Sequence, residues 1–245
     1  MKRSTVFLGV FIILASSFLI EYYTNTRFPT NDLVVSHVPE LEVGRVHRFS
    51  YVHKLVDVGT TTYILTKKQG DMYTLESSSD VMTESGRIQL ESNFIFDEWF
   101  KPKSYILNVD QNGELDEIEV NFTENKVVSK VTVANETVTL SDEFPETAYM
   151  VENNMPGFWE ILLLSSDLDM GARYTVKVYI PQGGTLFDLQ FYVQNDPKTI
   201  TVEGQQLSCI VIQESTLDLR FYIYDGKMVQ MRNEDQDIIF TRLDD

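Results

Sequence analysis

Alternation of apolar and polar residues runs through most of this 245-residue chain and limits its fold more than any other feature. From about residue 45 onward, short segments alternate in this way, and turn-forming sequences separate them about every 8–12 residues. Neighbouring side chains of a strand lie on opposite faces, so the pattern predicts antiparallel strands with one buried face. No regular succession of strands and helices is present. We therefore expect a mainly β fold in which the antiparallel sheet is curved or barrel-like.

The expected strands follow one another as successive hairpins. Arg45–Asp57 is predicted as a single strand with Phe49, Tyr51, His53 and Leu55 on one face. Asn112-Gly113 predicts a tight turn, because these two residues readily adopt positive φ angles. The other expected strands are Tyr63–Thr66, Met72–Leu75, Ile88–Phe96, Ser104–Asp110, Glu114–Phe122, Val127–Val133, Tyr174–Ile180, Leu186–Val193, Thr199–Val202, Leu207–Gln213, Leu217–Tyr224, Lys227–Arg232 and Ile238–Leu243.

One segment departs from the strand pattern and predicts a helix. It begins near Pro156 and runs to Asp169, with Gly171 just beyond its end. The segment is apolar on nearly all sides, which is typical of a buried helix. We expect it to pack on a face of the sheet as a core helix; a lid or plug over an apolar cleft is the alternative.

The N-terminus carries the longest apolar run of the chain. Lys2 and Arg3 precede Val6–Ile20, which is apolar apart from two serines. Two interpretations fit residues 1–22: an uncleaved signal-anchor or transmembrane helix, which we favour, or a cleaved secretory signal peptide. Residues 23–40 are then expected to be a linker and residues 41–245 an extracytoplasmic β-domain. The membrane partner would be contacted through residues 5–20, whereas cleavage would leave a secreted or periplasmic protein.

The charge balance excludes one class of partner. The chain has 37 acidic and 20 basic side chains and a formal net charge of -17. Nucleic-acid binding needs clustered Lys and Arg against the phosphates, so we expect no nucleic-acid partner. Cys209 is the only cysteine and alternates with apolar neighbours, which predicts a buried, inert thiol and no internal disulfide.

Residue patterns that carry catalysis or bind metals are weak here. His47 and His53 share a predicted strand face but lie about 20 Å apart at the usual rise per residue, too far for one metal ion. The acidic run Asp110–Asp116 resembles a calcium loop, but its spacing favours a hairpin turn. We predict no catalytic residues, no metal site and no cofactor. Asn121 and Asn135 begin N-glycosylation sequons, which count only in a compartment with the transferase.

The layout from Met155 to the C-terminus resembles a known superfamily. The predicted helix is followed by Met170-Gly171-Ala172-Arg173-Tyr174 at the start of a strand, and the closing hairpin contains Tyr224-Asp225-Gly226-Lys227. This order is similar to that of uncharacterised exported families related to the lipoprotein-localisation factors (LolA/LolB-like), over about residues 40–243. The resemblance implies an unclosed antiparallel barrel, a helix on its concave face and an apolar cavity between them. The chain lacks a lipid-attachment cysteine near its N-terminus, which departs from the lipoprotein members.

Three functions are compatible with these features. The first is a non-enzymatic, membrane-tethered extracytoplasmic domain that binds a lipid or another apolar ligand in a half-barrel cavity. The second is a structural ectodomain that contacts another envelope protein, and the third is a carboxylate-based hydrolase. For the first function, the candidate cavity residues are Phe158, Trp159, Leu162, Leu163, Phe191 and Phe221.

Overall fold

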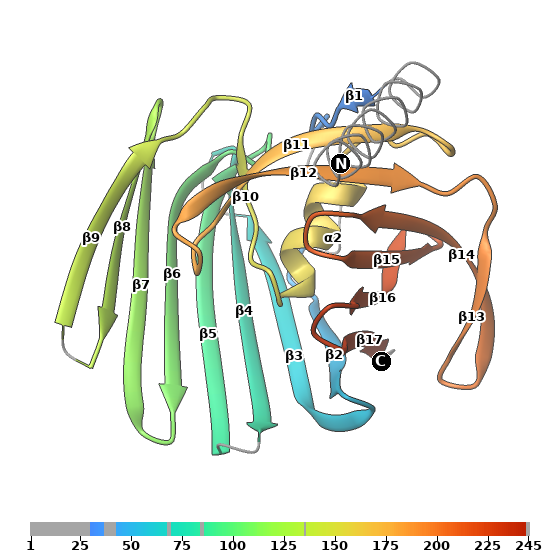
Figure 1. Ribbon diagram of the computed structural model, residues 1–245, viewed down its shortest axis with the longest axis horizontal. Helices are drawn as coiled ribbons and strands as arrows, with labels where there is room; N and C mark the ends of the chain where they lie inside the picture. The colour runs from blue at the N-terminus through green and yellow to red at the C-terminus, as the bar shows by residue number, and fades with distance from the viewer. Residues whose placement is uncertain (1–29, 37–42, 68–69, 84–85, 135, 244–245) are drawn as a thin grey trace, which may run out of the picture.

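The computed structural model describes residues 30–36, 43–67, 70–83, 86–134 and 136–243, and these residues form one large β-sheet around one helix (Figure 1). The sheet contains 17 described strands and does not close into a barrel. Strand β1 (Thr30–Asp32) lies at one end of the strand order and strand β9 (Glu136–Glu143) at the other. Mainly β architecture with an unclosed sheet was the fold expected from the sequence. The predicted N-terminal hydrophobic helix lies outside the described residues, and within them no helix has the length and apolarity needed to cross a bilayer.

Apart from β1, the sheet consists of two series of strands that follow one another in the sequence. The first consists of β2 (Val46–His53), β3 (Val56–Lys67), β4 (Met72–Thr83), β5 (Gly86–Asp97), β6 (Pro102–Gln111), β7 (Glu114–Thr123), β8 (Lys126–Val133) and β9 (Glu136–Glu143). The second consists of β10 (Tyr149–Met150), β11 (Arg173–Ile180), β12 (Thr185–Val193), β13 (Lys198–Val202), β14 (Gln205–Glu214), β15 (Leu219–Tyr224), β16 (Lys227–Asn233) and β17 (Ile238–Leu243). The C-terminal strand β17 pairs antiparallel with β2 and thereby joins the two halves.

The turn chemistry explains several of the hairpins. At the β6–β7 turn, Asn112 and Gly113 have φ angles of 56° and 91°, and Asp110 Oδ1 accepts a hydrogen bond from the Gly113 N–H at 2.7 Å. The acidic run beginning at Asp110 is therefore part of a hairpin. The predicted single strand Arg45–Asp57 is wrong, because Lys54 and Leu55 adopt φ angles of 50° and 66° and divide it into β2 and β3.

Helix α2 (Pro156–Leu164) lies between the two halves of the sheet in Figure 1 and is shorter than predicted. It ends before Ser165, whose carbonyl accepts a hydrogen bond from the Ser36 N–H at 2.9 Å. Ser166 then forms an isolated antiparallel bridge with Val35. Backbone pairing with a distant segment therefore replaces the last predicted helical turn.

The segment that contains Val35 and Ser36 lies within residues 23–40, which we predicted to be a linker. β1 (Thr30–Asp32) pairs in parallel with β11, and the Leu33 N–H donates to the Thr175 carbonyl at 2.8 Å. Leu33 and Val35 are only 4% and 3% exposed. Residues 30–35 thus belong to the folded domain, because their two apolar side chains complete its core.

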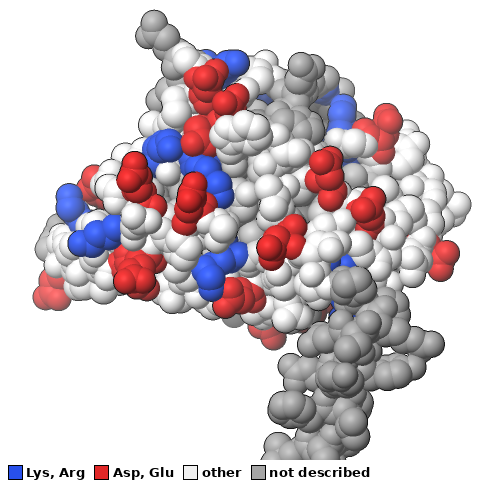
Figure 2. All heavy atoms as spheres, turned by 90° about the horizontal axis from the view of Figure 1, so that it is seen from above, with Lys and Arg blue, Asp and Glu red and all other residues white. Residues whose placement is uncertain are grey.

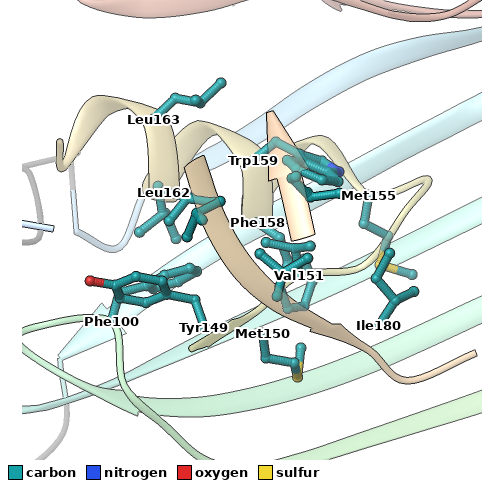
Figure 3. Close-up of a cluster of buried hydrophobic side chains, with 14 of the residues drawn as sticks. Phe100, Tyr149, Met150, Val151, Met155, Phe158, Trp159, Leu162, Leu163 and Ile180 are labelled. Carbon is teal, nitrogen blue, oxygen red and sulfur yellow. The ribbon is translucent and has the colours of Figure 1, made fainter. Parts of the chain in front are cut away.

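The main core fills the space between α2 and the inner face of the sheet (Figure 3). Phe94, for example, stacks on Phe158 of the helix with ring centroids 5.3 Å apart. A second, smaller cluster of buried apolar residues lies where β13 packs against β14, β15 and β16, and Cys209 belongs to it. Burial raises the pKa of the Cys209 thiol and keeps it protonated.

Candidate functional site

A short turn between β5 and β6 positions the candidate site. Asp97 Oδ1 accepts hydrogen bonds from the backbone N–H groups of Trp99 and Lys101 at 3.1 and 2.9 Å. This side-chain-to-backbone capping is a usual role of aspartate in turns. Phe100 sits at a φ of 58° and is fully buried, whereas Trp99 beside it is 50% exposed. The turn therefore presents a tryptophan to solvent above a packed phenylalanine.

Beside this turn lies a pocket of about 500 Å³, which we call the Trp99 pocket. Its size falls within the range of about 300–1,000 Å³ that is usual for small-molecule sites. The apolar part of its wall comes from four elements: the β5–β6 turn, the segment after β1, β10 and β11. The lining residues are Asp32, Leu33, Val34, Val35, Trp99, Lys101, Glu146, Thr147, Tyr149, Thr175, Val176, Lys177 and Asp188.

Tyr149 connects the walls of the Trp99 pocket. Its hydroxyl accepts a hydrogen bond from the Val35 N–H at 3.1 Å, and its ring stacks on Phe100 with centroids 6.3 Å apart (Figure 3). Burial raises the pKa of Tyr149, so its hydroxyl is protonated at neutral pH. The floor of the pocket is thus continuous with the main core, while Val34 is 62% exposed at its edge.

Lys101 places an ammonium group at the wall of the Trp99 pocket. Its Nζ lies 3.7 Å from the centroid of the Tyr149 ring and 3.5 Å from the Ala148 carbonyl oxygen. A cation over an aromatic face is attracted by the ring quadrupole. The nearby carboxylate of Asp97 forms its ion pair with Lys103 instead, at 3.1 Å. Partial burial lowers the pKa of Lys101 to about 8, against the opposing charges of Asp97 and Glu146.

The helix is fixed to the sheet by a buried ion pair. Arg242 Nη2 of β17 donates to both carboxylate oxygens of Glu160 at 2.6 and 2.5 Å, and the Tyr63 hydroxyl donates to the same carboxylate at 2.5 Å. Arg242 also bonds the Met228 carbonyl and His47 Nδ1, which must accept because arginine only donates. Burial raises the pKa of Glu160, and its donors counteract that effect. These contacts anchor α2 and argue against a movable lid.

A second carboxylate lies in the same core, in the loop before α2. Glu152 is 2% exposed and accepts a hydrogen bond from the Tyr105 hydroxyl at 2.5 Å. Burial raises its pKa to about 7, although hydrogen bonds from Tyr105 and Gln182 oppose the change. Because Glu152 and Glu160 are both shielded from solvent, neither can reach a substrate in this structure, and the hydrolase hypothesis gains no support from them.

The six predicted cavity residues lie together in the packed core. Trp159 contacts Phe221 with ring centroids 5.4 Å apart, and Phe221 contacts Phe191 at 6.3 Å. None of the six is more than 2% exposed. The space expected to be a cavity is filled because α2 is apolar on nearly all sides and its side chains occupy the concave face. Phe191 also borders a largely polar pocket of about 320 Å³ that includes Arg173 and Glu214.

Sequence analysis did not identify Trp99 or Lys101. An available signal was the pair Trp99-Phe100 inside a predicted inter-strand turn, where large apolar residues are unusual.

The predicted sequons and the surface charges can also be located. Asn121 is exposed on β7 and donates to Glu119 at 3.2 Å, whereas Asn135 lies outside the described residues. Lys and Arg side chains are interspersed with Asp and Glu on the face shown in Figure 2.

Comparison with known proteins shows the fold alone. No family model and no curated protein sequence matches the chain. Among solved structures, a β-barrel-like protein of the domain of unknown function DUF1849 from Brucella abortus is similar, with a TM-score of 0.52 and 11% identity. That match covers 81% of this chain and 94% of the other.

A DUF1089 family protein from Pseudomonas aeruginosa gives a TM-score of 0.40 at 11% identity, covering 69% of this chain and 87% of that one, too weak a likeness for an argument. Neither description names the lipoprotein-localisation factors, so that resemblance stays a prediction. The sheet of this chain is unclosed, and its fold is similar to that of the β-barrel-like DUF1849 structure.

Proposed function

We propose that this chain is a non-enzymatic binding domain that holds an apolar ligand, such as an acyl chain, in the Trp99 pocket. The observation that carries the proposal is the half-exposed Trp99 over an apolar wall contributed by four separate elements. Exposed aromatic and aliphatic surface in a concave site gains free energy when a ligand removes it from water. The ligand site therefore lies at the β5–β6 turn and not beneath α2.

Binding of decanol to the full-length chain tests this function. Decanol is neutral, so it reports on the apolar wall alone. Val34→Asp should weaken binding at least about tenfold, because ligand would have to desolvate a carboxylate. Val56→Asp is the matched control: Val56 is 60% exposed, close to the 62% of Val34, and does not line the pocket. Equal affinity in both variants, or no binding by the unaltered chain, would refute the proposal.

The proposal includes a tether to the membrane, with the β-domain outside the cytoplasm. Its support is the apolar run Val6–Ile20 after Lys2 and Arg3, since basic residues favour the cytoplasmic side. Alkaline carbonate extraction should leave the chain in the membrane pellet. Added protease should digest the β-domain only after the permeability barriers outside the cytoplasmic membrane are opened. Release into the supernatant at the mass expected after signal cleavage would favour the secreted form.

A second function, interaction with another envelope protein, is favoured by β9. All eight residues of β9 are exposed, and among the described strands β9 pairs only with β8. Long unpaired edge strands readily accept another strand. The uncharged centre Thr137–Ser141 is flanked by Glu136, Asp142 and Glu143, which would repel a second copy and attract a cationic segment.

A labelled peptide strand tests this second function. A Thr-Val repeat flanked by lysines should bind the full-length chain with a salt-sensitive affinity, and the same repeat flanked by glutamates should not bind. Identical behaviour of the two peptides, or concentration-dependent dimers of the chain in sedimentation, would contradict a cationic partner.

A further inference from the structure

We propose that the Trp99 pocket selects amphiphiles with a carboxylate head group and that Lys101 is the residue that pairs with this head group. This inference rests on the proposed function and specifies its ligand class. The apolar wall would take the tail, and the ammonium would take the charged end. The argument begins with the ion pairs near Lys101.

Lys101 is a half-buried cation, and the neighbouring Asp97 is already engaged. Asp97 is fixed by two backbone N–H groups and by the Lys103 ammonium. Within the described part of the chain, no carboxylate lies within ion-pairing distance of Lys101 Nζ. A partly desolvated ammonium gains more from an opposite charge than an exposed one does, because less screening water surrounds it. A ligand carboxylate would provide that charge.

The Lys101 ammonium and the apolar surface of Trp99 also border the same pocket, where one ligand can contact both. Lys101 and Trp99 are two residues apart on the same turn, and Asp97 holds the backbone N–H of both. Tyr149 holds Nζ over its ring and borders the same pocket. A single amphiphile can therefore contact the ammonium and the indole together, whereas a purely apolar ligand would leave the ammonium without an anionic partner.

The remaining charged groups around the pocket set the limits of this selectivity. Lys177 is paired with Asp188 at 2.5 Å. Asp32 and Glu146 line the pocket and would disfavour an anion placed beside them. Binding of a carboxylate is therefore expected only where Lys101 is nearest, and it should weaken as pH rises above about 8, where Lys101 loses its proton. Decanol binding should not change over that range.

A head-group series on the full-length chain tests the inference. Decanoate should bind about tenfold more tightly than decanol at pH 7, and decylamine should bind more weakly than decanol. Lys101→Met keeps the length of the side chain and should abolish the preference for decanoate over decanol. Lys198→Met, at an exposed position of β13 outside the pocket, should keep the preference.

The outcomes separate this inference from the proposed function. Binding of all three ligands without a head-group preference, or a preference that survives in Lys101→Met, would overturn the role of Lys101 and leave the apolar site standing. Absence of decanol binding would overturn the proposed function itself. Circular dichroism spectra of the two variants would identify any loss of folding before affinities are compared.

Discussion

The buried Glu152 should make the stability of the fold depend on pH near neutrality. Its pKa in the folded protein is raised from 4.5 to about 7. At about 1.4 kcal/mol per pKa unit, this corresponds to about 3 kcal/mol. Between pH 4.5 and 7, folded Glu152 keeps a proton that the unfolded state has released. The stabilisation of about 3 kcal/mol is therefore complete below pH 4.5 and is lost as pH rises through 7. Glu152→Gln removes the ionisable group but keeps an acceptor for Tyr105.

Urea unfolding of the full-length chain at pH 5 and pH 8 measures this effect. The unaltered chain should lose about 2–3 kcal/mol more unfolding free energy between the two values than Glu152→Gln does. Glu76→Gln, at an exposed position of β4, controls for the removal of one negative charge and should behave like the unaltered chain. The reasoning is refuted if Glu152→Gln retains the full pH dependence of the unaltered chain.

Three further outcomes follow from the packing. Arg242→Met should lower the unfolding free energy by about 3–5 kcal/mol because it leaves a buried carboxylate without its partner, whereas Arg87→Met at an exposed ion pair should have a much smaller effect in the same urea titrations. Gly157→Ala should lower the thermal midpoint, because its Cβ would lie 2.7 Å from the ring of Tyr63; an unchanged midpoint would contradict the close packing. Cys209 should react with a thiol reagent only at the rate of unfolding, and fast labelling of the native chain would show an open second core.

The sequence predicted the strands well because alternation and turn residues are local signals. Asn112-Gly113 is an example: both residues adopt the positive φ angles expected of them. The turn at Lys54-Leu55 was missed because neither residue is a usual turn former, and tertiary pairing of β2 and β3 imposes its conformation. β9 was also missed, since its alternation is limited to Val138 and Leu140 and all eight of its residues are exposed.

The candidate site was harder to predict because its parts are distant in sequence. Tyr149 reaches Val35 across 114 residues, and Arg242 reaches Glu160 across 82. The all-round apolar helix correctly predicted burial but did not show whether the space beside it was filled. Pairing of Val35 and Ser36 with the residues just after α2 was equally hidden, because the sequence of residues 23–40 is a polar stretch with a few apolar residues.

The two tryptophans of the chain allow the location of the ligand to be measured directly. Trp99 borders the proposed site, whereas Trp159 is one of the predicted cavity residues and lies in the filled core. Bromine quenches indole fluorescence at short range, so a brominated decanoate reports which tryptophan the tail approaches. The account predicts saturable quenching in Trp159→Phe, where Trp99 remains, and none in Trp99→Phe. Quenching confined to Trp159 would place the ligand under α2 and contradict the account.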